Sequence, residues 1–212
     1  MILDLHIHTN WHSGCSILDP FDLVLRAIEL KLDGIVITEH NYKWTEEELN
    51  KLRDFVEVKK KKLLILSGQE VRAYKENGKI DGDILTFGFY GKIKKKTKAE
   101  EIISLVHKEN AVAVAAHPYR NSLGLKDRIY ELELDGIEVL NSNHTEEDIK
   151  KAEMAAEKLG ISKIGGSDAH EIERIGKFLT YFEEEIFSER DLIEAIKLRK
   201  CKPIRYEDFL KK

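Results

Sequence analysis

Histidine and acidic residues recur in this sequence directly after short apolar segments that read as buried β-strands. Imidazole and carboxylate groups are common protein ligands of divalent transition metals. Several such groups at strand ends favour a multinuclear metal site, and such a site in an α/β protein indicates chemistry on a substrate. The residues concerned are His6, His8, His40, Glu70, His117, Asp168 and His170.

The spacing of two pairs of these residues indicates which side chains lie together. His6 and His8 are two positions apart at the end of one strand, so both side chains point to the same face and can share one ion. Asp168 and His170 repeat this spacing. Each pair therefore predicts two ligands at one end of a strand.

Three further residues extend the predicted site. His40 and His117 each directly follow an apolar strand, and Glu70 follows another apolar run across a Ser67-Gly68 break. A carboxylate can bridge two ions, which an imidazole does poorly. A lone histidine is most often an ordinary core or surface residue, but the joint arrangement favours a metal site over that alternative.

The elements that must position these residues alternate between strands and helices. Unbroken apolar strands with helices between them are typical of a parallel sheet covered on both faces, so we expect a barrel-like or doubly wound α/β domain. Strands are predicted at residues 2–6, 34–38, 63–66, 84–90, 111–116, 136–140 and 163–165, with a further edge strand at 178–182. Helices are predicted at about 21–32, 45–62, 98–109, 125–132, 145–159 and 188–198, and the capping boxes Thr45/Glu48 and Thr145/Asp148 open two of them.

Composition restricts the class of protein. The 212 residues suffice for one α/β domain, and the net charge of −4, from 35 Lys and Arg against 39 Asp and Glu, argues against a dedicated nucleic-acid binder. Cys15 and Cys201 form no disulfide framework, which predicts a reducing, cytoplasmic location. We expect neither a signal peptide nor a membrane-spanning segment.

Four motifs in the same order resemble those of the PHP superfamily, named for polymerase and histidinol phosphatase. They are DLHIHT at residues 4–9, GIVITEHN at 34–41, AHP at 116–118 and GSDAH at 166–170. The resemblance covers nearly the whole chain. It implies a single domain over residues 1–212, folded as a distorted (β/α)7 TIM-like barrel with two or three divalent ions (Zn, Mn or Fe) at the strand C-termini.

The resemblance also implies how the ligands are divided. One ion would be held by His6, His8, Glu70 and Asp168. Glu70 would bridge to a second ion held by His117. The third ion would be held by His40 and His170.

Two positions depart from the pattern of the superfamily. Members often place a histidine early in the strand after the bridging glutamate, where this chain has Asp83. An oxygen ligand there would shift the preference toward harder metals such as Mn²⁺, although Asp83 could instead be a turn residue. The third ion usually takes a ligand from the loop after the first motif, where His12 is the first candidate and Cys15 the second.

Several residues near the predicted site have alternative interpretations. Glu39 could orient His40 or His8, or could be a charged residue at a strand end. Arg120 follows His117 closely and could bind a phosphate through its planar guanidinium, or could lie exposed on a loop. His144 is better explained by the start of a helix than by substrate contact.

These observations together predict a metal-dependent phosphoesterase in which a hydroxide, activated by a di- or trinuclear site, hydrolyses a small phosphomonoester such as histidinol phosphate, a nucleotide or a sugar phosphate. Asp168 and His170 are placed to manage a proton, and Arg120 to bind the substrate. An exonuclease or oligonucleotide-end phosphoesterase is the first alternative, with nucleic acid possible as a partner but not favoured. A non-catalytic, metal-stabilised module is the second alternative, which the intact ligand set disfavours.

Overall fold

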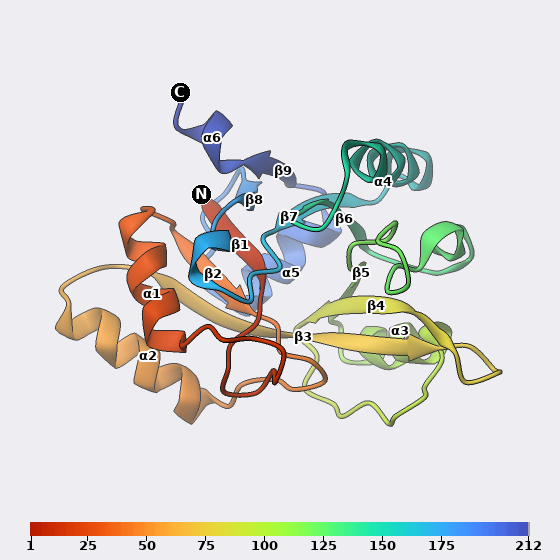
Figure 1. The fold of residues 1–212 in the computed structure, drawn as a ribbon, viewed down its shortest axis with the longest axis horizontal. Helices are drawn as coiled ribbons and strands as arrows, with labels where there is room; N and C mark the ends of the chain where they lie inside the picture. Colours follow the sequence, from red (N-terminus) through yellow and green to blue (C-terminus); the bar gives the residue numbers. More distant parts are fainter. Residues whose placement is uncertain (212) are drawn as a thin grey trace.

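The computed structural model describes residues 1–211, and a mixed sheet of nine strands forms its centre. The sheet order is β7-β6-β5-β4-β3-β2-β1-β8-β9 (Figure 1). The strands are β1 (Ile2–Ile7), β2 (Gly34–Ile37), β3 (Leu64–Tyr74), β4 (Ile80–Phe87), β5 (Val112–Ala115), β6 (Gly136–Asn141), β7 (Ser162–Gly166), β8 (Phe178–Phe182) and β9 (Cys201–Arg205).

The sheet curls until its β7 edge meets β1, which makes an almost closed barrel. Beyond β7, the amide of Asp168 donates to the His6 carbonyl at 2.7 Å, and the amide of His8 donates to the Ala169 carbonyl at 2.9 Å. These bonds hold the end of β7 against the end of β1, and Figure 1 shows these two strands side by side. The prediction of a barrel-like α/β fold is confirmed.

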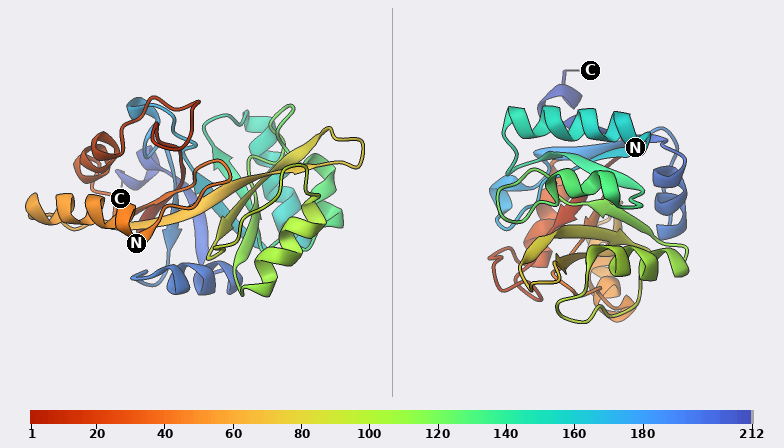
Figure 2. Two further views of the ribbon diagram at one scale, coloured as in Figure 1. Left: turned by 90° about the horizontal axis from the view of Figure 1, so that it is seen from below. Right: turned by 90° about the vertical axis from the view of Figure 1, so that its right-hand side faces the viewer.

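Helices cover the outside of the barrel. Figure 2 (left) shows α1 and α2 at one side of the sheet and α3 and α4 at the other. Both predicted capping boxes are present, at Thr45/Glu48 and Thr145/Asp148. The helices are α1 (Pro20–Glu29), α2 (Glu46–Val58), α3 (Ala99–Lys108), α4 (Glu146–Leu159), α5 (Glu189–Lys197) and α6 (Tyr206–Phe209), with 3₁₀ turns η1 (Lys126–Glu131) and η2 (Ile172–Arg174).

The apolar core is divided by the alternation of side chains along the strands. On β2, Ile35 and Ile37 pack outward against the cluster under α1 and α2, whereas Val36 points into the barrel. Helix α5 contributes Leu192 and Ile196 to the interior cluster. It lies at the barrel end where the parallel strands begin, because the Lys197 ammonium donates to the carbonyl of Asn110 just before β5. The opposite end is left open for polar side chains.

The expected parallel sheet is only partly realised. Strand β4 is antiparallel to both β3 and β5, and β8 is antiparallel to both β1 and β9. A turn at 75–79 joins β3 to β4 directly, without the helix that an all-parallel arrangement requires. Strand β4 also begins at Ile80 rather than at residue 84.

Two predictions about individual strands are wrong. The Ser67-Gly68 break does not exist, since β3 runs through it from Leu64 to Tyr74 and Glu70 lies in mid-strand. The segment 178–182 is not an edge strand, because β9, which was not predicted, pairs with its free side. Strand β9 is the last in the sheet order, and Pro203 is compatible with this position because one edge of an outer strand needs no hydrogen-bond partner.

No helix among residues 1–211 is both long enough and apolar enough to cross a membrane.

Candidate metal centre

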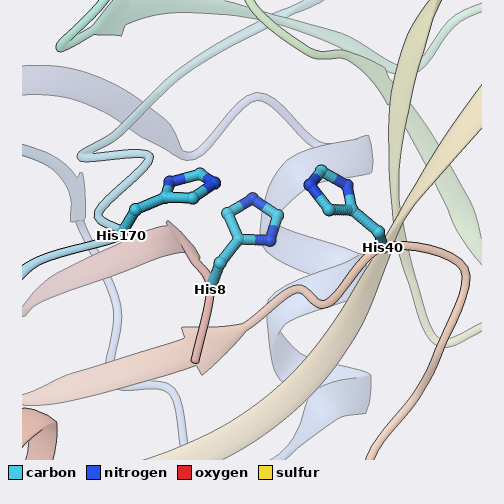
Figure 3. A group of neighbouring side chains, drawn as sticks. All are labelled: His8, His40 and His170. Atoms are coloured by element: carbon cyan, nitrogen blue, oxygen red, sulfur yellow. The ribbon is translucent and has the colours of Figure 1, made fainter. Parts of the chain in front are cut away.

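The predicted ligands meet at the open end of the barrel. The cluster draws on the ends of β1, β2, β5 and β7 and on mid-strand positions of β3 and β4. Figure 3 shows His8 between His40 and His170, with all three rings turned toward one region. The residues that the structure brings together are His6, His8, His40, Glu70, Asp83, His117, Asp168 and His170.

Glu70 lies at the middle of this cluster. One carboxylate oxygen, Oε1, is 2.8 Å from His117 Nε2, and the other, Oε2, is 2.9 Å from His40 Nδ1 and 3.3 Å from His8 Nε2. The side chain is buried, so its two oxygens face two different sets of ligands within the protein. This is the arrangement that a bridging carboxylate requires.

The spacing of the first group of ligand atoms matches a coordination shell. His6 Nε2 and His8 Nε2 are 3.1 Å apart, and Asp168 Oδ1 is 3.5 Å from each of them. Ligand atoms around a tetrahedral zinc ion, at bond lengths of about 2.0–2.1 Å, are separated by roughly 3.3 Å. Two imidazole nitrogens and a carboxylate oxygen at these separations fit a divalent ion.

Two further groups of ligand atoms adjoin the first. Glu70, Asp83 and His117 offer one ligand atom each within 4.8 Å of one another, and His8, His40 and His170 do the same. In the second of these groups, the His8 ring centroid is 4.4 Å from that of His40 and 4.5 Å from that of His170. The donor chemistry of the cluster therefore suits divalent metal ions, as the sequence predicted.

The buried charges of the cluster depend on one another. Burial alone would lower the pKa of His6, but the carboxylates of Glu138, Asp168 and Glu70 raise it well above its ordinary value. Burial alone would raise the pKa of Asp168, but the imidazoles of His6 and His8 bring it below its ordinary value. Without a metal ion, protons on the imidazoles balance the carboxylates, and metal binding would release those protons.

Two residues of the cluster have an unusual backbone conformation. His117 has φ = 30° and Asp168 has φ = 52°, both in the left-handed region that non-glycine residues rarely adopt. Each residue follows the end of a strand, so the turn aims its side chain back over the barrel mouth. Strained positions of this kind concentrate at functional sites.

Glu138 is a buried member of the site that the sequence analysis missed. It lies on β6, and its Oε1 accepts a hydrogen bond from His6 Nδ1 at 2.9 Å. Its Oε2 accepts from the His117 amide at 2.8 Å and from Asn141 Nδ2 at 2.9 Å. A carboxylate bonded to the outer nitrogen of a ligand histidine fixes the ring and its tautomer. A glutamate inside the apolar segment 136–140 was the available signal.

Glu39 orients the loop after β1, and through Ser13 it is linked both to His8 and to the His40 amide. It accepts hydrogen bonds from the Thr9 amide and hydroxyl, from Trp44 Nε1 at 3.1 Å and from the Ser13 hydroxyl. The Ser13 oxygen in turn lies 3.3 Å from His8 Nδ1. Of the two interpretations left open for Glu39, the structure supports an indirect contact with His8.

His12 is not brought together with the other predicted ligands within residues 1–211. Its Nε2 is 2.8 Å from Glu48 Oε1, and its ring stacks on Tyr42 with centroids 3.9 Å apart. His12 and Cys15 both line the cavity over the cluster, and Cys15 is exposed. The role of His12 as a ligand of a third ion stays a prediction.

Arg120 reaches the cluster from the loop after β5. Its Nη1 donates to Asp168 Oδ2 at 3.1 Å, and Asn143 Nδ2 donates to the same oxygen at 2.8 Å. Arg120 therefore lies at the cavity rather than on a remote loop. The cavity has a volume of about 440 Å³ and is also lined by His170, Arg72 and Asp83.

His107 and His144 lie apart from the ligand groups. His107 Nε2 contacts Asp135 Oδ2 at 2.9 Å beside α3, and His144 Nδ1 contacts the Val139 carbonyl at 3.0 Å just before α4. The position of His144 agrees with the role at the start of a helix that the sequence suggested.

The fold and the site together define an α/β barrel with a candidate multinuclear metal centre at one end. The chain belongs to the PHP family: residues 4–142 match the PHP domain, and residues 146–201 match the PHP-associated region PHP_C. Both matched segments contribute to the one sheet, since β7, β8 and the first residue of β9 come from the second.

The chain is also similar to one curated protein and to several solved structures. The chain is 32% identical to the protein MJ1587 of Methanocaldococcus jannaschii over 155 residues, which are 68% of this chain and 84% of that protein. A solved structure from Bifidobacterium adolescentis, assigned as a metal-dependent phosphoesterase, is 18% identical with a TM-score of 0.63, over 93% of this chain and 96% of that one. A two-domain protein from Bacteroides vulgatus, containing a predicted PHP-like metal-dependent phosphoesterase, is 17% identical with a TM-score of 0.71, over 100% of this chain and 68% of that one. At these identities the two structures share the fold.

Proposed function

We propose that this protein is a metal-dependent phosphoesterase that hydrolyses small phosphomonoesters with two or three divalent ions. The observation that carries the proposal is the position of Glu70, whose Oε1 lies beside His117 and whose Oε2 lies beside His40, in a cavity with an arginine at its wall. The names given to the two solved structures support it, because both refer to metal-dependent phosphoesterases.

The ligand groups would divide among the ions as the sequence implied. His6, His8, Asp168 and Glu70 would hold the first ion, and Glu70, Asp83 and His117 the second. The third ion would be held by His40 and His170, beside His8. When bound, Zn²⁺, Mn²⁺ or Fe²⁺ would lower the pKa of water and offset charge on the phosphoryl oxygens.

The residues of the chain would bind and orient the substrate. Arg120 uses one nitrogen on Asp168, which leaves other guanidinium N–H groups for a phosphate in the cavity. The imidazole of His170 has a pKa below its ordinary value, because of burial and of the nearby His8, so it is neutral and able to bind an ion or accept a proton.

Water is a better candidate for the nucleophile than a side chain. Ser13 and Cys15 line the cavity. The Ser13 hydroxyl already donates to Glu39. Partial desolvation at the cavity wall and the nearby carboxylates raise the pKa of the Cys15 thiol, which keeps it protonated near neutral pH. Direct attack by water avoids a covalent intermediate on either residue.

The size and charge of the site favour a small substrate. A cavity of about 440 Å³ is in the range of small-molecule sites. A net charge of −4 gives no overall excess of positive charge for binding a long nucleic acid. Histidinol phosphate, nucleotides and sugar phosphates are therefore the first esters to test.

The test combines metal content with a substrate screen. Untagged protein, purified without chelators, is analysed by elemental mass spectrometry and then assayed on those esters with the metal found. We expect two or three equivalents of Zn, Mn or Fe and release of phosphate, with Asp168→Asn as the inactive control. Faster degradation of short RNA or DNA would mean that the substrate is an oligonucleotide end and not a small phosphomonoester. Less than one equivalent of metal, unimproved by adding metal back, would refute the proposal.

A further inference from the structure

Arg72 and Asp83 form a bidentate ion pair at the edge of the ligand group made of Glu70, Asp83 and His117. They are direct partners in the antiparallel ladder between β3 and β4. Arg72 Nε donates to Asp83 Oδ1 at 2.8 Å, and Arg72 Nη2 donates to Asp83 Oδ2 at 2.9 Å. Both carboxylate oxygens of Asp83 are therefore engaged by one guanidinium.

Asp168 is paired with an arginine in a different way. Arg120 and Asn143 both donate to Oδ2, and Oδ1 faces His6 and His8. An ion in the first group can thus use Oδ1 without displacing the arginine. An ion bound by Glu70, Asp83 and His117 has no such free oxygen on Asp83.

We propose that Arg72 competes with the second ion for Asp83 and so makes that position weaker than the first. Its guanidinium supplies a positive charge to the buried carboxylates Glu70 and Asp83 when no ion is bound, and an ion that binds Asp83 must either displace it from an oxygen or share that oxygen against its positive charge. This inference rests on the ligand set of the proposed function, and not on the identity of the substrate.

The two partners differ in their freedom to move. Asp83 is buried, and its backbone is fixed because its amide donates to the Leu123 carbonyl and its carbonyl accepts from the Ala116 amide. The second of these bonds also fixes Asp83 beside His117, the residue that follows Ala116. The Arg72 side chain is 31% exposed and lines the cavity, so it can turn away from Asp83 within the cavity. Ion binding is therefore expected to move Arg72 and leave Asp83 in place.

Glu70 and Arg72 are two residues apart on β3 and so lie on the same face of the strand. The guanidinium displaced from Asp83 would remain at the cavity wall, opposite a bound anionic group. The same side chain would then oppose the second ion before it binds and contact the substrate after it binds.

The test is a titration of metal-free protein with Mn²⁺ by isothermal titration calorimetry. Arg72→Gln removes the competitor, and Arg120→Gln is the matched control because it removes the same charge from the same cavity. We expect Arg72→Gln to tighten the weaker site on the order of tenfold more than Arg120→Gln does, since a charged hydrogen-bonded pair no longer has to be broken. In the background of Asp83→Asn, Arg72→Gln should give no such gain.

Equal effects of the two arginine variants, or a gain that persists with Asp83→Asn, would overturn the inference while leaving the metal site intact. Wild-type protein that binds no Mn²⁺ would overturn both the inference and the proposed function. If Arg72→Gln does not fold without metal, Arg72→Lys serves instead, because lysine keeps the charge but cannot hold both oxygens. It should then give a smaller gain in the same direction, and no gain would count against competition.

Discussion

Glu138 accepts a hydrogen bond from His6 Nδ1 at 2.9 Å, across the interior of the barrel from β6 to β1. The same carboxylate accepts from the His117 amide at 2.8 Å. One buried side chain therefore holds two candidate ligands that lie 111 positions apart in the sequence, one from each of two ligand groups. Glu138 contributes to the geometry of the site without belonging to any of its ligand groups.

Replacing Glu138 by glutamine should weaken metal binding by about 10- to 100-fold, the usual cost of losing a partner of a ligand histidine. Glutamine retains the shape but not the charge that fixes the tautomer of His6. Titration of metal-free protein with Zn²⁺ or Mn²⁺ measures the effect, and Glu133→Gln, at an exposed position nearby, is the control. Equal affinities for the two variants would mean that Glu138 is only a structural residue.

The candidate ligands could be picked out from the sequence because their signal is local. A histidine or carboxylate at the end of an apolar strand can be read from the sequence, and the two-residue spacing of His6 and His8 places both on one face. The capping boxes at Thr45 and Thr145 were predictable for the same reason, since each is contained in four residues.

Features that depend on pairing between strands were not predictable. Gly68 was interpreted as a break, but it lies within the continuous strand β3. The residue is glycine because a Cβ there would lie 2.7 Å from the Thr86 carbonyl oxygen on the neighbouring strand. The pairing of Arg72 with Asp83 depends on the register between β3 and β4, which no single segment encodes. Strand β9 has five residues, contains Pro203 and shows no apolar alternation, so its sequence carries no strand signal.

Replacing Asp168, a candidate ligand, by asparagine should lower phosphoester hydrolysis by at least about 100-fold. Losing even a hydrogen-bond partner of a ligand costs about 10- to 100-fold, and the loss of a ligand itself should cost no less. The fold should survive, because asparagine tolerates the left-handed backbone at φ = 52°. Phosphate release by metal-loaded protein and circular dichroism together check this prediction. Asp54→Asn, an exposed substitution on α2, should retain full activity. Full activity of Asp168→Asn would remove this residue from the proposed site.

Replacing Glu39 by alanine should destabilise the protein by about 2–5 kcal/mol, because the Thr9 amide, the Trp44 indole N–H and two hydroxyls lose their buried acceptor. Glu39→Gln retains one acceptor oxygen and should cost less. Chemical denaturation in the presence of a chelator measures the free energy of unfolding without a contribution from bound metal. A loss below about 0.5 kcal/mol for the alanine variant would show that water replaces the carboxylate, since surface substitutions fall in that range.

The two cysteines should react differently as pH rises. Burial raises the pKa of Cys201 to about 11, so at pH 8 only about one thiol in a thousand is ionised. Because the thiolate is the reactive form, labelling of Cys201 by iodoacetamide should be slow at pH 8 and should accelerate about tenfold per pH unit up to pH 10. The exposed Cys15 should label faster throughout. Mass spectrometry follows both sites, and equal rates in denaturant are the control.

The same shift carries a consequence for stability. The unfolded chain loses the Cys201 proton at a lower pH than the folded chain, so the contribution of this thiol to stability is complete below its ordinary pKa. It is lost as pH rises from about 9 toward 11. Cys201→Ser should reduce this loss, and rapid labelling of Cys201 at pH 8 in folded protein would contradict both expectations.

Gly166 tests whether the packing behind the ligands matters as much as the ligands themselves. A Cβ at this position would lie 2.5 Å from the Cβ of His6 and 2.8 Å from Glu138 Oε1, which is closer than atoms can approach. Gly166→Ala should therefore push His6 and Glu138 apart and lower metal affinity, although no ligand is changed. Gly14→Ala is the matched control, since a Cβ at Gly14 would meet nothing within 4 Å. We expect a loss for Gly166→Ala of at least the size found for Glu138→Gln, because glutamine can still accept from His6, whereas the added methyl group separates the two partners and also displaces the backbone. Unchanged affinity would mean that β7 can shift away from β1 without disturbing the cluster.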